Sequence, residues 1–375
     1  MDVALDRDAL YYPYIHVRDA NWLKATLLSF PQVRRIVPYN FQLDDLDEVK
    51  PFRNVKGARG EPLLGDEPAY LYSAFQAQER LLARLQGTAP EQLDRFTLAN
   101  TQSDFPDNPN VFQLHAGKMQ PLLEFLRVRD LAWPARQRSA SNPNEWFALH
   151  PKLGEVVMSL IAMAIANEKQ LDIVTSSGRV HRALANLDEA ALVNSLFGDA
   201  PGSRSITPAL DMVDELCQVV MLTAFDMSKL TALNIADLQK DGKDLRRFKS
   251  EILKIAAAIP DISDAAEREK RLALAAQEVT SEWEKYRRSL PRFAVDALLS
   301  VATWKPPELL TTALAGATSM AMLSSGTGVV IGLGIFAGFG VWRGYREKTS
   351  SPYQYLTQIH RAGALLAPKP VAASA

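Results

Sequence analysis

Cysteine is almost missing from this sequence, with Cys217 the single example in 375 residues. One cysteine excludes an internal disulfide framework and a cage of thiolate ligands around a metal, and it suits a reducing compartment. An excess of positive charge is missing too, because 42 Lys and Arg are balanced by 43 Asp and Glu to give a net charge of -1. A dedicated nucleic-acid-binding protein is therefore not expected.

Targeting signals and catalytic motifs are also lacking. The opening MDVALDRDALYY has acidic residues where a secretory signal needs a basic region and an apolar core, so we expect a cytoplasmic protein. There is no HExxH or Cys/His ligand spacing, no Walker-A or GxGxxG loop and no GxSxG elbow. The sequence thus predicts no metal and no cofactor, and it leaves enzymatic activity uncertain, with the balance against it.

What the sequence does contain is a long run without charge. Residues 309–342, about 34 in number, carry no ionisable side chain, which exceeds the ~20 residues needed to cross a bilayer. Arg343 follows the run directly, and Trp342 stands at its end. Several glycines recur at the four-residue spacing that lets helices approach closely. They are Gly328 with Gly332, Gly334 with Gly338, and Gly340 with Gly344 just after the run.

This run predicts a C-terminal apolar hairpin of two short helices, with a break at residues 324–328. Each arm of about fifteen residues is short for a span at ~1.5 Å rise per residue. Two interpretations stay open. The hairpin inserts into or associates with the inner membrane, peripherally or integrally, with Trp342 at headgroup level and Arg343 on the cytoplasmic side. Alternatively, it buries itself on the protein or at an oligomer interface.

The N-terminal half is typical of a mixed α/β domain. Residues 9–17 and 32–37 have the aromatic and β-branched composition of strands, and a helical stretch lies between them. This βαβ-type opening favours an α+β or α/β class. Residues 42–68 predict a loop. Residues 69–85, 119–128 and 151–167 predict helices, with Pro151 in the first turn of the last, and residues 171–175 predict a buried strand.

The second half predicts long charged helices. Residues 234–259 and 265–290 have helical periodicity with Pro260 between them, the pattern of an αα-hairpin or a short antiparallel coiled coil. We therefore divide the chain into a mixed α/β domain (1–225), a charged helical hairpin (226–304), the glycine- and alanine-rich apolar hairpin (305–348) and a tail (349–375).

Candidate functional residues follow two of the predicted strands. His16 and Asp19 stand after the first strand, where α/β folds often place functional groups. A strand end exposed to solvent is the simpler interpretation of these two residues. After the strand at 171–175, backbone amides and a nearby base predict an anion site or a weak nucleophile and base, although ordinary helix capping also explains them. These residues are Ser176, Ser177, Gly178, Arg179 and His181.

An acidic cluster, Asp44, Asp45, Asp47 and Glu48, lies in the predicted loop. It lacks the glycine and terminal glutamate of an EF-hand, so we interpret it as a solvated loop.

Several blocks of the sequence carry a resemblance. The blocks LYYPYIHVRDANWLK, RRIVP, HPKLGEVVMSLIAMAIANEKQLDIVT, DLRRFKSEI and SPYQYL together resemble a family of uncharacterised bacterial proteins of unknown function. The resemblance covers most of the chain and implies a bacterial, intracellular protein, but it assigns no activity. The arrangement of an α/β body, helices and an apolar segment also looks like that of membrane-acting stress or antiphage effectors, by architectural analogy alone.

Three hypotheses for function follow. The first is a non-enzymatic sensor or effector, in which the α/β body recognises a signal or protein partner and the apolar hairpin inserts into a membrane or mediates self-association. The second is an α/β enzyme with a site near residues 16–19 and 175–182. The third is a soluble structural assembly protein.

Overall fold

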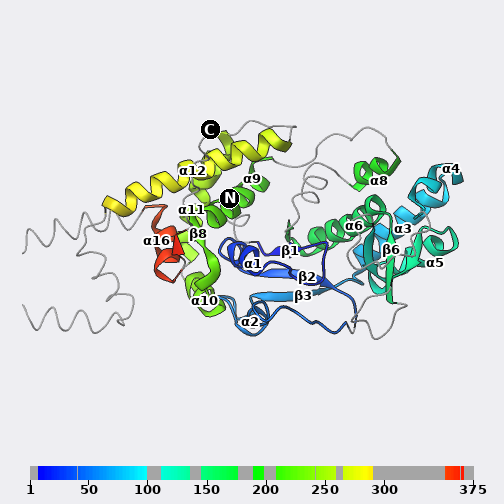
Figure 1. Cartoon of the computed structure of the whole chain (residues 1–375), viewed down its shortest axis with the longest axis horizontal. Helices are drawn as coiled ribbons and strands as arrows, with labels where there is room; N and C mark the ends of the chain where they lie inside the picture. Colours follow the sequence, from blue (N-terminus) through cyan, green and yellow to red (C-terminus); the bar gives the residue numbers. More distant parts are fainter. Residues whose placement is uncertain are drawn as a thin grey trace, which may run out of the picture.

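The computed structural model confirms a mixed α/β class, with one parallel sheet, a small antiparallel sheet and many helices. Figure 1 shows the strands β1, β2 and β3 near the middle of the chain's long axis, with helical groups at either side. The structure describes residues 7–39, 41–98, 111–135, 145–175, 189–197, 208–240, 242–258, 265–289, 351–363 and 365–366.

The main sheet has four parallel strands in the order β3-β2-β1-β7. They are β1 (Ala9–Tyr11), β2 (Val33–Val37), β3 (Leu64–Pro68) and β7 (Asp172–Val174). Leu10 is paired with Arg34 on one side and with Ile173 on the other. The first strand, at Ala9–Tyr11, is shorter than the predicted 9–17. It ends two residues before Pro13, and proline has no N–H to donate to a ladder.

The predicted loop at 42–68 was wrong. It contains the helix α2 (Lys50–Asn54) and the edge strand β3, whose sequence is LGDEP. That composition of glycine, acid and proline does not indicate a strand. The strand forms because its backbone pairs in parallel with β2 from Leu64 to Pro68.

Successive residues of β1 face two different cores, as the period of two requires. Ala9 and Tyr11 belong to a core with α1 (Ala20–Leu27) and α9 (Pro208–Ala224). Leu10, together with Ile36 of β2, belongs to a core with α3, α5 and α6. Helices therefore cover both faces, the arrangement of a doubly wound sheet. The helices of the second core are α3 (Tyr72–Gln86), α5 (Gln120–Val128) and α6 (Pro151–Lys169).

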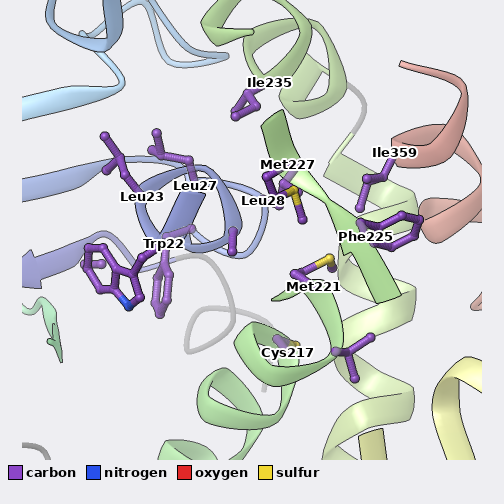
Figure 2. Close-up of a cluster of buried hydrophobic side chains, with 14 of the residues drawn as sticks. Trp22, Leu23, Leu27, Leu28, Cys217, Met221, Phe225, Met227, Ile235 and Ile359 are labelled. Carbon is purple, nitrogen blue, oxygen red and sulfur yellow. The ribbon is translucent and has the colours of Figure 1, made fainter. Parts of the chain in front are cut away.

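Helix α1 anchors the first core. Figure 2 shows Leu23 and Leu27 of α1, and Leu28 directly after it, on one side of the cluster. Met221 of α9 and Phe225 of the strand that follows lie on the other side. All of these side chains are at most 2% exposed. Burying one such side chain contributes roughly 1.5–3 kcal/mol. The distant segments 20–28 and 217–227 are thus held in one core.

A second sheet is antiparallel and has the order β4-β6-β5. Its strands are β4 (Phe112–His115), β6 (Trp146–Leu149) and β5 (Ala132–Pro134). It packs on α6, where a Cβ added at Gly154 would lie 2.4 Å from the ring of Phe112. Glycine allows this close approach of helix and strand. The predicted helix at 151–167 is confirmed as α6, with Pro151 in its first turn.

The long helices of the second half are confirmed as helices, but the first is divided. Residues 234–259 form α10 (Ala232–Lys240) and α11 (Gly242–Ala258), and the second helix is α12 (Ala265–Ser289). Both α11 and α12 pack chiefly against α9. The main packing partner of both helices is therefore a third helix, α9, and not the other arm of the predicted hairpin. Figure 1 shows α9 next to both α11 and α12.

The end of the described chain packs into the first core. Tyr355, Leu356 and Ile359 of α16 (Gln354–Arg361) are all fully buried. Trp283 of α12 donates a hydrogen bond to Thr357 at 3.2 Å. The remaining elements are η2 (Asp94–Phe96), η4 (Ala116–Lys118), η6 (Met227–Lys229), α4 (Pro90–Leu93), α8 (Glu189–Phe197), β8 (Phe225–Asp226) and β9 (Leu365–Leu366).

Candidate functional site

The order of the parallel strands singles out one place on the sheet. From β1 the chain continues through α1 to β2 on one side, whereas β7 lies on the other side of β1. Such a reversal is a topological switch point, and ligands of open α/β sheets bind outside the carboxyl ends of the strands there. The backbone N–H of Tyr12 donates to the carbonyl of Val174 at 3.2 Å, so the loops after β1 and β7 begin side by side.

The sequence placed candidate residues on these same two loops. His16 and Asp19 lie in the described chain after β1. Ser176, Ser177, Gly178, Arg179 and His181 lie outside the described residues. That the two groups converge at one site therefore stays a prediction. The adjacency of the two strand ends is the part that the fold supplies.

His16 is held by a buried carboxylate. Its Nδ1 lies 3.4 Å from Oδ1 of Asp45. An ionised carboxylate can only accept, so Nδ1 carries a proton, and in the neutral imidazole Nε2 has the lone pair. The His16 side chain is 36% exposed, whereas Asp45 has no exposed side-chain surface. Asp45 thus orients the imidazole from the buried side, and solvent or a ligand can reach it from the exposed side.

Asp45 is itself fixed by Arg35, which lies within β2 and is fully buried. Both guanidinium nitrogens Nη1 and Nη2 donate to the carboxylate, the second at 2.9 Å, and Nε donates to Asp66 at 2.8 Å. Burial raises the pKa of the Asp45 carboxyl, but the hydrogen bonds from His16 and Arg35 and the charge of Arg35 outweigh burial and hold this pKa below its usual value.

The interpretation of the acidic cluster as a solvated loop is therefore wrong for one member. Asp45 is 3% exposed and belongs to this buried ion-pair network. The neighbouring Asp47 fits the interpretation, because its side chain is 95% exposed and pairs with the exposed Lys50. Sequence alone could not separate them, since both lie in one run of acids.

Asp19 has a capping contact. Its Oδ1 accepts from the backbone N–H groups of Asn21 at 2.8 Å and Trp22 at 3.0 Å, so it is the N-cap of α1. A carboxylate there satisfies unpaired N–H groups and the positive end of the helix dipole. The amides with which this helix would bind an external anion are therefore partly occupied by the chain's own side chain.

Three further rings lie on the outer side of His16, and Phe41 links it to the other two. We call His16, Phe41, His115 and Trp146 the edge cluster. The ring centroid of Phe41 lies 5.7 Å from that of His16, 5.4 Å from that of His115 and 6.0 Å from that of Trp146. His115 and Trp146 are themselves 5.3 Å apart. Nearby, Tyr39 and Tyr70 form an edge-to-face pair and are 73% and 58% exposed.

The second sheet brings His115 to this edge. A Cβ added at Gly117, in the turn after β4, would lie 3.1 Å from Pro38, the residue that follows β2. The Gly117 N–H donates to Nδ1 of His115 at 3.1 Å, so neutral His115 carries its proton on Nε2. That nitrogen lies 3.6 Å from Glu145. Burial lowers the pKa of His115, against the partial opposition of Glu145.

Lys118 ends the same turn and is 1% exposed. Within the described chain, no hydrogen bond or ion pair joins its ammonium group to another residue. Burial lowers the pKa of Lys118 to about 7, because the charged form loses its hydration without gaining a counter-ion. A lysine of this kind is rarely buried unless it has a task or a partner.

Sequence reasoning missed Arg35, Phe41, Lys118 and Trp146 as members of this region. The one available signal was an arginine within the predicted strand VRRIV, because charged residues are seldom found inside parallel sheets. The others come from separate segments, and no spacing rule connects residues 16, 41, 118 and 146.

Two further sequence predictions concern metals and membranes. In the part of the chain that the structure covers, no three His, Cys, Asp or Glu side chains gather as metal ligands would. Among the described helices, none is both long and apolar enough to cross a bilayer. The predicted apolar hairpin lies outside the described residues, including Gly328, Gly332, Gly334, Gly338, Gly340, Trp342 and Arg343.

Comparison with known protein families, with curated proteins and with solved structures finds no match to this chain. The resemblance to uncharacterised bacterial proteins accordingly stays an interpretation of the sequence blocks. Any functional conclusion must come from the geometry itself.

Proposed function

We propose that this protein is a sensor or effector whose α/β body binds a small planar ligand at the carboxyl edge of the main sheet. The observation that carries the proposal is the edge cluster beside the switch point of a doubly wound sheet. Aromatic side chains bind flat rings through their faces and edges. The Asp45-held His16 adds a hydrogen-bonding group whose Nε2 has no partner among the described residues.

The class of ligand follows from what the edge offers. The loop after β1 has no glycine to bring backbone amides to a pyrophosphate, and Asp19 already caps α1. Recognition of a phosphate at this helix is therefore disfavoured. The partly exposed rings of Phe41 and Trp146 favour a heteroaromatic compound such as a nucleobase instead.

A binding assay tests this recognition. We expect a nucleoside or another heteroaromatic compound from a panel to raise the melting temperature of the full chain. Phe41→Leu removes a central ring of the edge cluster and should abolish the shift. Phe125→Leu is a matched control, since Phe125 is a partly buried ring on α5 that no edge-cluster contact involves. Equal shifts in both variants, or no shift with any compound in the wild type, would contradict the proposal.

The response to the ligand is proposed to pass to the apolar segment at 309–342, which inserts into a membrane or mediates self-association. Support comes from the hydrogen bonds that join the two flanking helices, α12 and α16. Tyr286, near the end of α12, donates a hydrogen bond to Gln354 at 2.9 Å, and Trp283 donates to Thr357. The described ends on either side of residues 290–350 are thus held together on the body.

The packing of α16 on the body also decides how the apolar segment should be tested. A chain shortened before residue 351 would lose α16, whose Tyr355 and Leu356 are fully buried, and would fail for structural reasons. Gly334→Arg instead places one charge inside the run, and Ser350→Arg places it outside. We expect only the first to reduce recovery of the chain in alkali-washed membranes or its mass by light scattering. A soluble monomer in all three proteins would remove this half of the proposal.

A second candidate is an enzyme with its site at the same edge. It is favoured by one observation, the His16 imidazole oriented by a buried carboxylate, which is how general bases are commonly held. If this candidate is correct, His16→Ala should abolish the phenotype that the wild-type protein confers, although the variant still folds. Alanine at Asp19 should act through the lost cap of α1, costing about 0.5–2 kcal/mol. A phenotype insensitive to His16→Ala would exclude this candidate.

A further inference from the structure

The proposed recognition does not explain why Lys118 is buried. Its side chain is 1% exposed, and its ammonium group has no hydrogen-bonded or charged partner within the described chain. By contrast, the other well-buried basic groups are matched. Arg35 binds two aspartates, and Lys249 donates to Asp214 at 3.0 Å. An unmatched buried charge is costly, so the neutral amine is favoured.

Lys118 belongs to a turn that lies beside the ligand edge. It belongs to the turn that follows His115, and the preceding Gly117 packs on Pro38 at the carboxyl end of β2. His115 is in turn a member of the edge cluster and lies 3.6 Å from Glu145. The pKa of His115 is lowered first by burial and also by the charge of Lys118, which places the two groups within electrostatic reach.

We propose that Lys118 is a nucleophilic amine that forms an imine with the carbonyl group of an aldehyde or ketone bound at this edge. The inference rests on the edge being a ligand site and adds a covalent step to recognition. Burial lowers the pKa of Lys118 to about 7, so a large share of the amine is neutral at physiological pH. A desolvated lysine is a common way to obtain such a nucleophile.

The step balances without any further reactant. The Nζ lone pair attacks the carbonyl carbon, a C–N bond forms, and the C=O π pair moves to oxygen. A proton moves from nitrogen to that oxygen to give a carbinolamine. Loss of water, with one proton taken up by the leaving oxygen and one given up by nitrogen, yields the imine. His115, which is close to Glu145, is the group placed to carry these protons.

Trapping with salicylaldehyde tests the step. The probe is a planar ring that bears an aldehyde, and its imine is fixed as a secondary amine by cyanoborohydride. Peptide mapping then compares Lys118 with exposed lysines of the same chain, such as Lys240 and Lys254, whose side chains are 71% and 70% exposed. At pH 7 an ordinary lysine with pKa near 10.4 is neutral in only about one molecule in 2,500. We therefore expect Lys118 to be labelled at least about tenfold faster.

Variants and a matched probe separate the covalent step from recognition. Lys118→Met keeps an unbranched side chain that is one atom shorter and has no amine. It should lose the label and keep the fold, which circular dichroism checks. His115→Asn keeps an acceptor for the Gly117 N–H and should slow labelling of Lys118 and change its pH profile. Labelling of Lys118 that is no faster than that of Lys240 in the folded wild type overturns the inference.

Salicyl alcohol has the same ring without the carbonyl. If it stabilises the wild type and Lys118→Met alike while Lys118 stays unlabelled by the aldehyde, recognition at the edge stands and only the covalent step falls. If neither compound stabilises the chain and Lys118 is unlabelled, both fall. Rapid labelling that salicyl alcohol slows by competition supports both.

Discussion

The buried pair of Arg35 and Asp45 provides the sharpest test of the structure. Neither side chain has exposed surface, and the two groups share two hydrogen bonds. Asp45→Asn keeps the shape but removes the charge and turns part of the acceptor into a donor facing a guanidinium. Removing one partner of a buried pair costs about 3–5 kcal/mol. Because Arg35 keeps its contact with Asp66 at 2.8 Å, we expect the lower end of this range.

Urea unfolding of the full chain measures this cost from the midpoint and slope of the first cooperative transition. Asp47→Asn is the matched control, since it makes the same chemical change two residues away on a side chain that is 95% exposed. Its midpoint should equal that of the wild type. A midpoint for Asp45→Asn that coincides with that of Asp47→Asn would refute the buried network.

The pH dependence of the same variant checks the sign of the effect. The pKa of Asp45 is lowered in the folded protein, so its contribution is fully present above the unfolded pKa of about 3.9. The contribution is lost as the pH falls further through the folded pKa. Asp45→Asn has no such contribution to lose. The gap in unfolding free energy between wild type and variant should therefore narrow below about pH 4, and a constant gap would contradict the assignment.

Three further predictions concern packing and the buried lysine. Gly154→Ala should destabilise the chain by about 1–3 kcal/mol because the new methyl group would overlap Phe112, whereas Gly242→Ala, with open space around it, should not; equal melting temperatures would refute this contact. Trp283→Ala should cost about 3–5 kcal/mol in urea unfolding, and Trp283→Phe clearly less, since this ring is fully buried. Lys118→Met should be more stable than the wild type at pH 7. This advantage should shrink as the pH rises, by about 1.4 kcal/mol between pH 8 and pH 9, because the folded lysine with pKa about 7 binds fewer protons than the unfolded one; a pH-independent difference would contradict its burial.

Strong local patterns were enough to predict several elements. The apolar run after Pro151 is a helix, the segments at 32–37 and 171–175 contain β2 and β7, and the charged segment at 265–290 is α12. In each, composition and periodicity agree with the environment that the element meets in the fold. The mixed α/β class followed from them, because strands separated by helices favour a parallel sheet.

The misses share a physical cause. β3 is a strand because its backbone satisfies β2, although its residues do not favour strands. Asp45 is buried because Arg35, ten residues earlier on β2, needs a counter-ion inside the sheet layer. The long helices meet on α9, which the sequence did not distinguish as their partner. Each depends on a neighbour that is remote along the chain.

The sequence by itself determined the class of fold, the two loops that carry His16 and the residues after β7, and the segment that has no charge. These are properties of local composition, which acts through hydration and backbone preference. Tertiary structure alone decided that β1 and β7 are neighbours, that Phe41 lies against His16, and that His115 and Trp146 lie against Phe41. It also decided that Lys118 loses its hydration, because burial depends on which distant segments pack together.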